Sequence, residues 1–213
     1  METNNLPKTI PVFPLSNFII FPKTTVPLNI FEPRYIEMIN DCMSTNRIIG
    51  MVQPKKTGDL KKPDVYSIGS ACKITSFNET DDGRYIILIE GVSRFKINKE
   101  VKSDKLYRVF EVDYKQFEFD FEEYKENNQN IDLDYILNEL KQLFKNKGYK
   151  IDWKNLDKQN SYEIINSLSM ASPFSIEEKQ TLLEATDMNS RKDVFESILK
   201  TYTVSSFTNS TIQ

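Results

Sequence analysis

The strongest restriction on the fold comes from an apolar segment near the amino terminus that prolines interrupt. Pro14, Pro22, Pro27 and Pro33 divide VFPLSNFIIFPKTTVPLNIFEPRY into short extended pieces joined by tight corners. Proline has no backbone N–H to donate to a ladder, so a strand that contains one lies at a sheet edge or a bulge. We therefore expect part of this segment to lie at the edge of a sheet.

The first 121 residues are rich in β-strand signals. Proline, β-branched and aromatic residues dominate, and turn residues separate short apolar stretches. The clearest hairpin turns at Asp82 and Gly83, because glycine adopts a positive φ without strain. The candidate strands are Ile10–Phe13, Phe18–Phe21, Thr25–Ile30, Ile48–Gln53, Ser70–Asn78, Arg84–Glu90, Ser93–Asn98 and Tyr107–Phe119.

Three segments of this half carry signals of their own. Residues Pro33–Met43 predict a helix, since proline suits a first helical turn and apolar residues then recur on one face. The segment QPKKTGDLKKPD is rich in lysine, proline and glycine, which is typical of a solvated loop. Phe117, Phe119 and Phe121 alternate with acidic residues, which predicts a strand with one buried face.

The second half is helical. Apolar residues at the spacing of an amphipathic helix run from Leu133 to Phe144 and stop before Gly148, and Pro173 ends a second helix. Capping-box patterns begin two more helices, at Ser175 and at Ser190.

The segment EEYKENNQN between the two halves has almost no apolar content. We therefore divide the chain into a β-rich domain at residues 1–121, a linker at 122–130, and a helical bundle with a frayed tail at 131–213.

Several classes of chemistry are excluded by composition. The sequence has no histidine, so it has no imidazole metal ligand and no Ser-His or Cys-His pair. Cys42 and Cys72 lie far apart with no CxxC pattern, which predicts two buried, reduced thiols rather than a zinc site. The phosphate-binding motifs GxGxxG and GxxxxGK[ST] and the serine motifs GxSxG and SxxK do not occur. We expect no cofactor, no metal and no catalytic residue, although a Ser-Lys pair assembled from distant positions stays open.

The formal net charge of −3 does not favour nucleic acid as a partner. A basic cluster could contact phosphate or an acidic partner, but charged loops are usually only solvated; it consists of Lys55, Lys56, Lys61 and Lys62. The start METNNLPKTI lacks the features of a signal peptide, and the apolar runs are too short to cross a bilayer. We expect a cytoplasmic protein that does not bind membranes.

Four stretches of the sequence resemble the substrate-binding domain family found at the amino terminus of the ATP-dependent protease Lon. The resemblance implies an α+β fold, in which a six-stranded β pseudo-barrel of the PUA-like type precedes a helical bundle. This agrees with the β-rich and helical halves predicted above. The four stretches are IPVFPLSNFIIFPKTTVPLNIFEPRYIEMI, SIGSACKITSF, DGRYIILIEGVSRFKI and PFSIEEKQTLLEATDMNSRKDVFESIL.

The resemblance also implies a function without catalysis. The chain resembles short stand-alone members of the family, so we expect it to lack the ATPase and Ser-Lys peptidase modules of a full-length Lon protease. In the family this domain engages unfolded or tagged proteins and supports assembly. The implied partners are therefore unfolded proteins, a specific protein or peptide, and an ATP-dependent protease or ATPase.

Phe18, Phe21, Pro22 and Phe31 are the candidate residues for protein binding, because they stand in the apolar segment with the interrupting prolines. Binding would use an apolar groove or an exposed barrel edge that adds a strand, with the helical bundle shaping one wall. Three alternatives remain open: an RNA- or nucleotide-binding module, a hydrolase with an unrecognised site, and an assembly subunit or adaptor of a separately encoded ATPase-protease.

The motifs that carry the resemblance contain five residues that we interpret as structural. Glu32, Arg34 and Tyr35 belong to the IFEPRY element, where the guanidinium of Arg34 can tie the helix start to neighbouring backbone. Gly91 is expected at a β-bulge and Arg94 in a surface ion pair.

Overall fold

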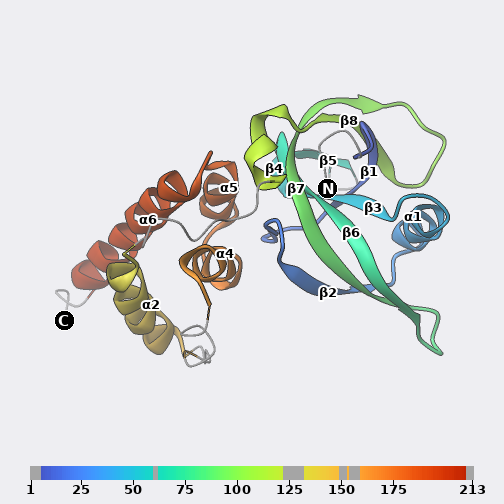
Figure 1. Ribbon diagram of the computed structural model, residues 1–213. Coiled ribbons are helices and arrows are strands. Elements are labelled where there is room, and N and C mark those ends of the chain that lie inside the picture. The colour runs from blue at the N-terminus through green and yellow to red at the C-terminus, as the bar shows by residue number, and fades with distance from the viewer. Residues whose placement is uncertain (1–5, 60–61, 122–131, 149–152, 154–158, 210–213) are drawn as a thin grey trace. The chain divides into compact units, whose positions relative to one another are not determined.

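The computed structural model describes residues 6–59, 62–121, 132–148, 153 and 159–209 (Figure 1). The chain forms two compact units. The barrel unit comprises Met1–Glu123 and Phe174–Leu183, and the helical unit comprises Tyr124–Pro173 and Glu184–Gln213. The predicted linker at 122–130 lies outside the described residues.

The barrel unit is built on a six-stranded sheet in the order β2-β7-β6-β3-β1-β8, with a further pairing of β7 and β8. That pairing closes β7, β6, β3, β1 and β8 into a ring, while β2 lies outside the ring and pairs with β7. Figure 1 shows the long β6–β7 hairpin as one side of this barrel. The strands are β1 (Thr9–Pro14), β2 (Thr25–Ile30), β3 (Ile48–Val52), β4 (Pro54–Asp59), β5 (Lys62–Val65), β6 (Ile68–Glu79), β7 (Tyr85–Val101) and β8 (Arg108–Asp113).

The length of β7 makes the closure possible. Its first residues, Tyr85–Glu90, pair with β2, and its last residues, Lys96–Val101, pair with β8. Alternate side chains from the ring point inward and form one apolar core. Its members are Leu6, Ile10, Val12, Ile48, Val52, Ala71, Phe95, Phe110, Val112 and Tyr114.

Helix α1 (Pro33–Met43) begins with Pro33 in its first turn, as predicted. It buries Tyr35, Met38, Ile39 and Cys42 on one face. The predicted Asp82–Gly83 turn is also confirmed, with Gly83 at a φ of 77° between β6 and β7.

Three predicted elements of the barrel unit differ from the structure. Residues 18–21 form no strand; they belong to an irregular segment between β1 and β2. Residues 115–121 form the 3₁₀ helix η2 (Lys115–Phe121) rather than the end of a strand, and η2 buries Phe117 and Asp120, three positions apart. The predicted solvated loop contains β4 and β5, which pair as a separate two-stranded sheet.

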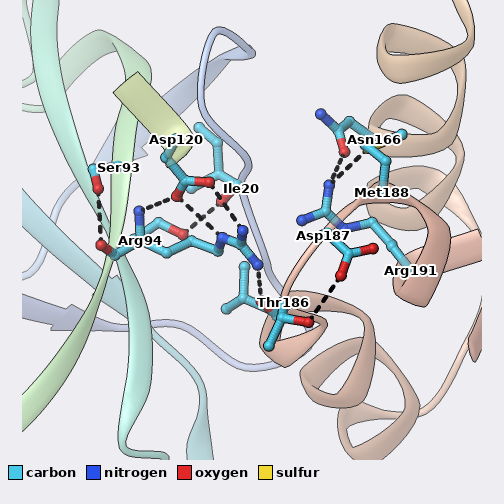
Figure 2. A network of polar contacts seen from close by, with 11 residues as sticks. Ile20, Ser93, Arg94, Asp120, Asn166, Thr186, Asp187, Met188 and Arg191 are labelled. Atoms are coloured by element: carbon cyan, nitrogen blue, oxygen red, sulfur yellow. Dashed lines mark hydrogen bonds and ion pairs between the residues drawn. The ribbon is translucent and has the colours of Figure 1, made fainter. Parts of the chain in front are cut away.

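The helical unit contains α2 (Asp134–Lys147), α4 (Ser161–Ala171) and α6 (Met188–Asn209). Gly148 ends α2 in the left-handed conformation, as predicted. Helix α6 begins earlier than predicted: its N-cap is Asp187, whose carboxylate accepts a hydrogen bond from the Ser190 N–H at 2.9 Å. Arg191 of α6 donates to the Asn166 side chain of α4 at 2.6 Å, and both residues are buried (Figure 2).

Helix α5 (Ile176–Glu184) lies with the barrel except for its last residue. The predicted capping box opens it, with Glu178 N–H donating to Ser175 Oγ and Ser175 N–H donating to the Glu178 carboxylate. The side-chain amide of Gln180 donates to the Ile68 carbonyl at 3.1 Å, which ties α5 to β6. The prediction that all of 131–213 forms one bundle therefore requires correction, because residues 174–183 pack on the barrel.

Candidate functional site

One row of apolar side chains lies on the outer face of β2 and β7. Pro27 of β2 pairs with Leu88 of β7, and Asn29 pairs with Ile86. Along both strands, these positions alternate with more buried ones, so they share the outer face. Ile86 is 46% exposed, and Phe31, which follows β2, is 65% exposed. Pro27, Phe31, Ile86 and Leu88 are called the apolar strip below.

The free edge of β2 is poorly suited to adding a strand. Gly91 N–H donates to the Thr24 carbonyl at 2.9 Å. Because pairs in an antiparallel ladder alternate between bonded and non-bonded, Thr25, Pro27 and Asn29 turn their backbone groups to the free edge. Pro27 has no N–H to offer there, and a proline on an edge strand blocks further pairing. The outer face of the sheet is thus a better binding surface than its edge.

The predicted contact residues separate into two pairs. Phe31 is exposed and Phe18 is half-buried, but Phe21 and Pro22 are buried. We therefore correct the predicted set: Phe21 and Pro22 are corner residues of the barrel and are not available to a partner in this structure.

Gly91 explains why this corner is so tight. Lys23 N–H donates to the Gly91 carbonyl at 2.8 Å. A Cβ atom on Gly91 would lie 2.1 Å from the Phe21 carbonyl oxygen, so only glycine fits. The expected bulge is present as well, because Ala71 pairs with Ser93 and Cys72 with Gly91, which leaves one extra residue on β7.

The predicted surface ion pair of Arg94 is wrong, because Arg94 is 0% exposed. Phe95 points into the barrel core, so Arg94 points to the outer side of β7, where η2 and α5 cover it. Its guanidinium donates to both Asp120 oxygens, at 2.9 and 3.1 Å, and to the Leu183 carbonyl at 2.9 Å (Figure 2). It also lies 4.4 Å from the Phe117 ring centroid. Arg94 is therefore an internal anchor rather than a binding residue.

The IFEPRY element forms an exposed ion pair at the start of α1. Arg34 Nε donates to Glu32 Oε2 at 2.9 Å, so the guanidinium binds a side chain rather than the predicted backbone. It also lies over the Tyr35 ring, 4.5 Å from its centroid, while Phe13 packs on the same ring at 4.0 Å. Burial raises the pKa of the Tyr35 hydroxyl, although the nearby Arg34 charge opposes this shift.

Arg34 and Tyr35 line a groove of about 590 Å³. Its other walls are the end of β7, the start of β8 and, of the residues between these strands, all but Asp104, together with Pro54 and Pro63 of the small sheet. Leu106 stands on the rim and is 65% exposed. The lining carries one acidic residue, Glu100, and five basic residues: Arg34, Lys62, Lys102, Lys105 and Arg108. We call this cavity the basic groove.

Ion pairs shape the basic groove. Glu100 accepts from Arg108 at 2.9 and 3.2 Å and pairs with Lys62 at 2.9 Å, and the Arg108 hydrogen bonds in particular hold the pKa of Glu100 below its ordinary value. On α1, Asp41 pairs with Lys105 at 2.8 Å and accepts from the Tyr107 hydroxyl at 2.7 Å. These contacts, from Lys105 first, lower the pKa of Asp41.

The described lysines of the predicted cluster each have a different partner. Lys55 lies over the Tyr66 ring, Lys56 pairs with Glu177, and Lys62 pairs with Glu100. Lys61 lies outside the described residues.

Within the described residues, no group of three or more acidic or cysteine side chains could hold a metal ion. Cys42 and Cys72 are buried free thiols, and burial raises the pKa of Cys42 to about 12 and that of Cys72 still further. None of the helices in this part of the chain has the length and apolar character needed to cross a bilayer.

The structural neighbours share this fold. The chain is similar to the crystal structure of a Lon N-terminal domain protein from Xanthomonas campestris, with a TM-score of 0.62 and 20% identity, over 90% of this chain and 97% of that one. It is also similar to the N-terminal domain of the Lon protease of the Mycobacterium avium complex, with a TM-score of 0.63 and 16% identity, over 91% and 98% of the two chains.

Curated relatives carry the same match in longer proteins. A Lon protease of Malacoplasma penetrans is 30% identical over 89% of this chain and 25% of its own length. One of Flavobacterium johnsoniae is 26% identical over 90% of this chain and 24% of its own length. The chain thus spans about a quarter of the length of these relatives. The family model of the ATP-dependent protease La (LON) substrate-binding domain matches residues 9–201, and the chain belongs to this family.

Proposed function

We propose that the chain is a non-catalytic protein-binding module whose apolar strip captures exposed apolar segments of other proteins. The observation that carries this proposal is the exposure of Ile86 on the outer sheet face next to Leu88 and Pro27, together with the exposure of Phe31, which directly follows β2. Neighbouring apolar side chains that remain in water are typical of interaction sites. Membership of the substrate-binding family supports the same reading.

The chemistry of the rest of the barrel unit is consistent with binding alone. Its buried ion pair holds η2 and α5 on the barrel, and its thiols have raised pKa values that disfavour the nucleophilic thiolate. The edge of β2 is blocked by Pro27, so the contact would be made by side chains on the sheet face rather than by an added strand.

The test is the fluorescence anisotropy of a labelled protein that cannot refold, such as a reduced and carboxymethylated protein, titrated with the full chain. Burial of one Phe or Ile side chain is worth about 1.5–3 kcal/mol, so the double variant Phe31→Ser/Ile86→Ser should raise Kd at least tenfold. Tyr135→Ser is the matched control, because Tyr135 is an exposed aromatic of the helical unit.

High salt separates this mode from electrostatic capture. Apolar contact predicts that Kd changes little between about 0.05 and 0.5 M NaCl. Unchanged binding by a well-folded Phe31→Ser/Ile86→Ser variant would show that the apolar strip is not the site.

The relatives suggest where a captured segment goes. They are Lon proteases, and so we propose that an ATP-dependent protease is the recipient of the bound protein. Co-purification of the chain with such a protease, and faster degradation of the captured protein in its presence, would support this role. Equal degradation rates with and without the chain would argue against it.

A further inference from the structure

The basic groove has an excess of positive charge that its own ion pairs do not remove. Glu100 is a single carboxylate shared by Arg108 and Lys62, so this trio keeps one positive charge. Glu32 neutralises Arg34, and Glu37 and Asp41 of α1 offset Lys105. Among the described residues, no acidic side chain pairs with Lys102. A local positive site on a chain with a formal net charge of −3 attracts acidic groups specifically to this position.

Apolar surface lies directly beside these charges. Leu106 stands on the rim with 65% exposure, four positions after Lys102, and Pro54 and Pro63 line the same groove. A ligand that fills the groove therefore meets an apolar contact and a positive charge within one short segment.

We propose that the basic groove binds an extended peptide segment in which acidic residues stand next to a large apolar residue. The apolar residue packs against Leu106 and the prolines, and the carboxylates face Lys102 and the Arg108–Lys62 pair that shares Glu100. This inference rests on the proposed protein-binding function and adds a second, charge-selective site to the apolar strip.

The groove suits a peptide better than a nucleic acid. Single-stranded nucleic acids bind through aromatic rings on which bases stack. The Tyr35 ring is already in contact with the Arg34 guanidinium and the Phe13 ring. Tyr107 is held on α1 by its hydrogen bond to Asp41.

The experiment compares three labelled peptides in Gly-Ser flanks: one with the core Asp-Glu-Leu-Phe, a neutral one with Asn-Gln-Leu-Phe, and one with Asp-Glu-Ser-Gly. The full chain should bind the first peptide most tightly, and its preference over the neutral peptide should shrink at high salt. Equal affinity for the acidic and the neutral peptide would overturn the proposal.

A charge swap then assigns the site. Lys102→Gln should raise the Kd of the acidic peptide by about 1.4-fold to fivefold, since exposed ion pairs are worth about 0.2–1 kcal/mol, and should leave the Kd of the neutral peptide unchanged. Lys102→Glu should weaken binding of the acidic peptide further and should strengthen binding of a peptide with the core Lys-Lys-Leu-Phe. Lys145→Glu, on an exposed position of α2, is the matched control. An unchanged preference in Lys102→Glu would place the acidic site elsewhere.

Two further arms keep the outcomes distinct. The Phe31→Ser/Ile86→Ser variant should no longer bind the unfolded protein but should bind the acidic peptide with unchanged affinity. If the variant still binds both, the apolar strip is not the site that binds unfolded protein, whereas the proposal for the basic groove is unaffected. In competition experiments, oligouridine and the unlabelled acidic peptide each displace the labelled acidic peptide. If oligouridine does so at the lower concentration, the groove is a nucleic-acid site and the peptide proposal is refuted.

Discussion

Replacing Arg94 by methionine should destabilise the barrel unit strongly, because it leaves a buried carboxylate behind. Methionine keeps much of the apolar stem but removes the guanidinium that binds both oxygens of Asp120. Asp120 is then a buried charge that keeps the hydrogen bond from the backbone N–H of residue 94, at 2.8 Å, but has lost the guanidinium. The Leu183 carbonyl loses its donor from Arg94 at the same time.

The expected loss is about 3–5 kcal/mol of unfolding free energy, the cost of removing one partner from a buried ion pair. This is a large part of the roughly 5–15 kcal/mol that stabilises a typical domain. The double variant Arg94→Met/Asp120→Leu should recover most of the loss, because neither charge remains to be buried. The control is Arg84→Met, which breaks an ion pair with Asp82 on the surface and should cost no more than about 1 kcal/mol.

The assay is equilibrium unfolding in urea with two signals. The single tryptophan, Trp153, belongs to the helical unit, so its fluorescence reports that unit. Circular dichroism of the strands follows the barrel, where the change is expected. A loss below about 1 kcal/mol in Arg94→Met, or a double variant less stable than the single one, would refute the reasoning.

Four other tests probe single features of the barrel unit. Gly91→Ala should lower the unfolding free energy by about 3 kcal/mol or more, because its Cβ would collide with backbone. Gly83→Ala meets no neighbour and should lower it by only about 1–2 kcal/mol, the cost of a positive φ. Thermal unfolding of both variants gives the comparison. Cys42 and Cys72 should react with a thiol reagent only as fast as the barrel unfolds, and a fast reaction of native protein at pH 8 would contradict their burial. The pKa of Cys42 is raised from 9.0 to about 12 in the folded state, so the unfolded chain releases the thiol proton at lower pH than the folded chain does. The urea midpoint of unfolding should therefore fall as pH rises above about 9. A midpoint that rises there would contradict the direction of this pKa shift. Ser175→Ala should cost about 0.5–2 kcal/mol by removing the N-cap of α5, and Ser175→Thr should restore most of it.

Much of the local structure could be predicted from the sequence, because it depends on neighbours along the chain. Gly83 turns the hairpin, Gly148 ends α2, and the Ser175–Glu178 box opens α5, each through a backbone conformation or a hydrogen bond within a few residues. Pro33 begins α1 for the same kind of reason. The family motifs added the barrel fold, which the solved structures support.

The elements that were mispredicted depend on contacts between distant residues. The phenylalanines at 117, 119 and 121 have the alternation of a strand, but η2 forms there and brings Asp120 to Arg94. The segment at 18–21 has strand-forming residues, yet its end is a corner packed on Gly91. In both places tertiary packing overrides local propensity.

The sequence by itself determined the hairpin turn at Gly83, the start of α1, the end of α2, the capping box of α5 and the absence of histidine chemistry. Only the tertiary structure decided which residues share a surface: Pro27 with Leu88 on the outer sheet face, and Arg34 with Lys102 and Leu106 in the basic groove. It also decided that Arg94 is an anchor, since its partner Leu183 lies 89 positions away. Backbone preferences act over a few residues, whereas burial and charge pairing depend on segments that meet only when the barrel closes.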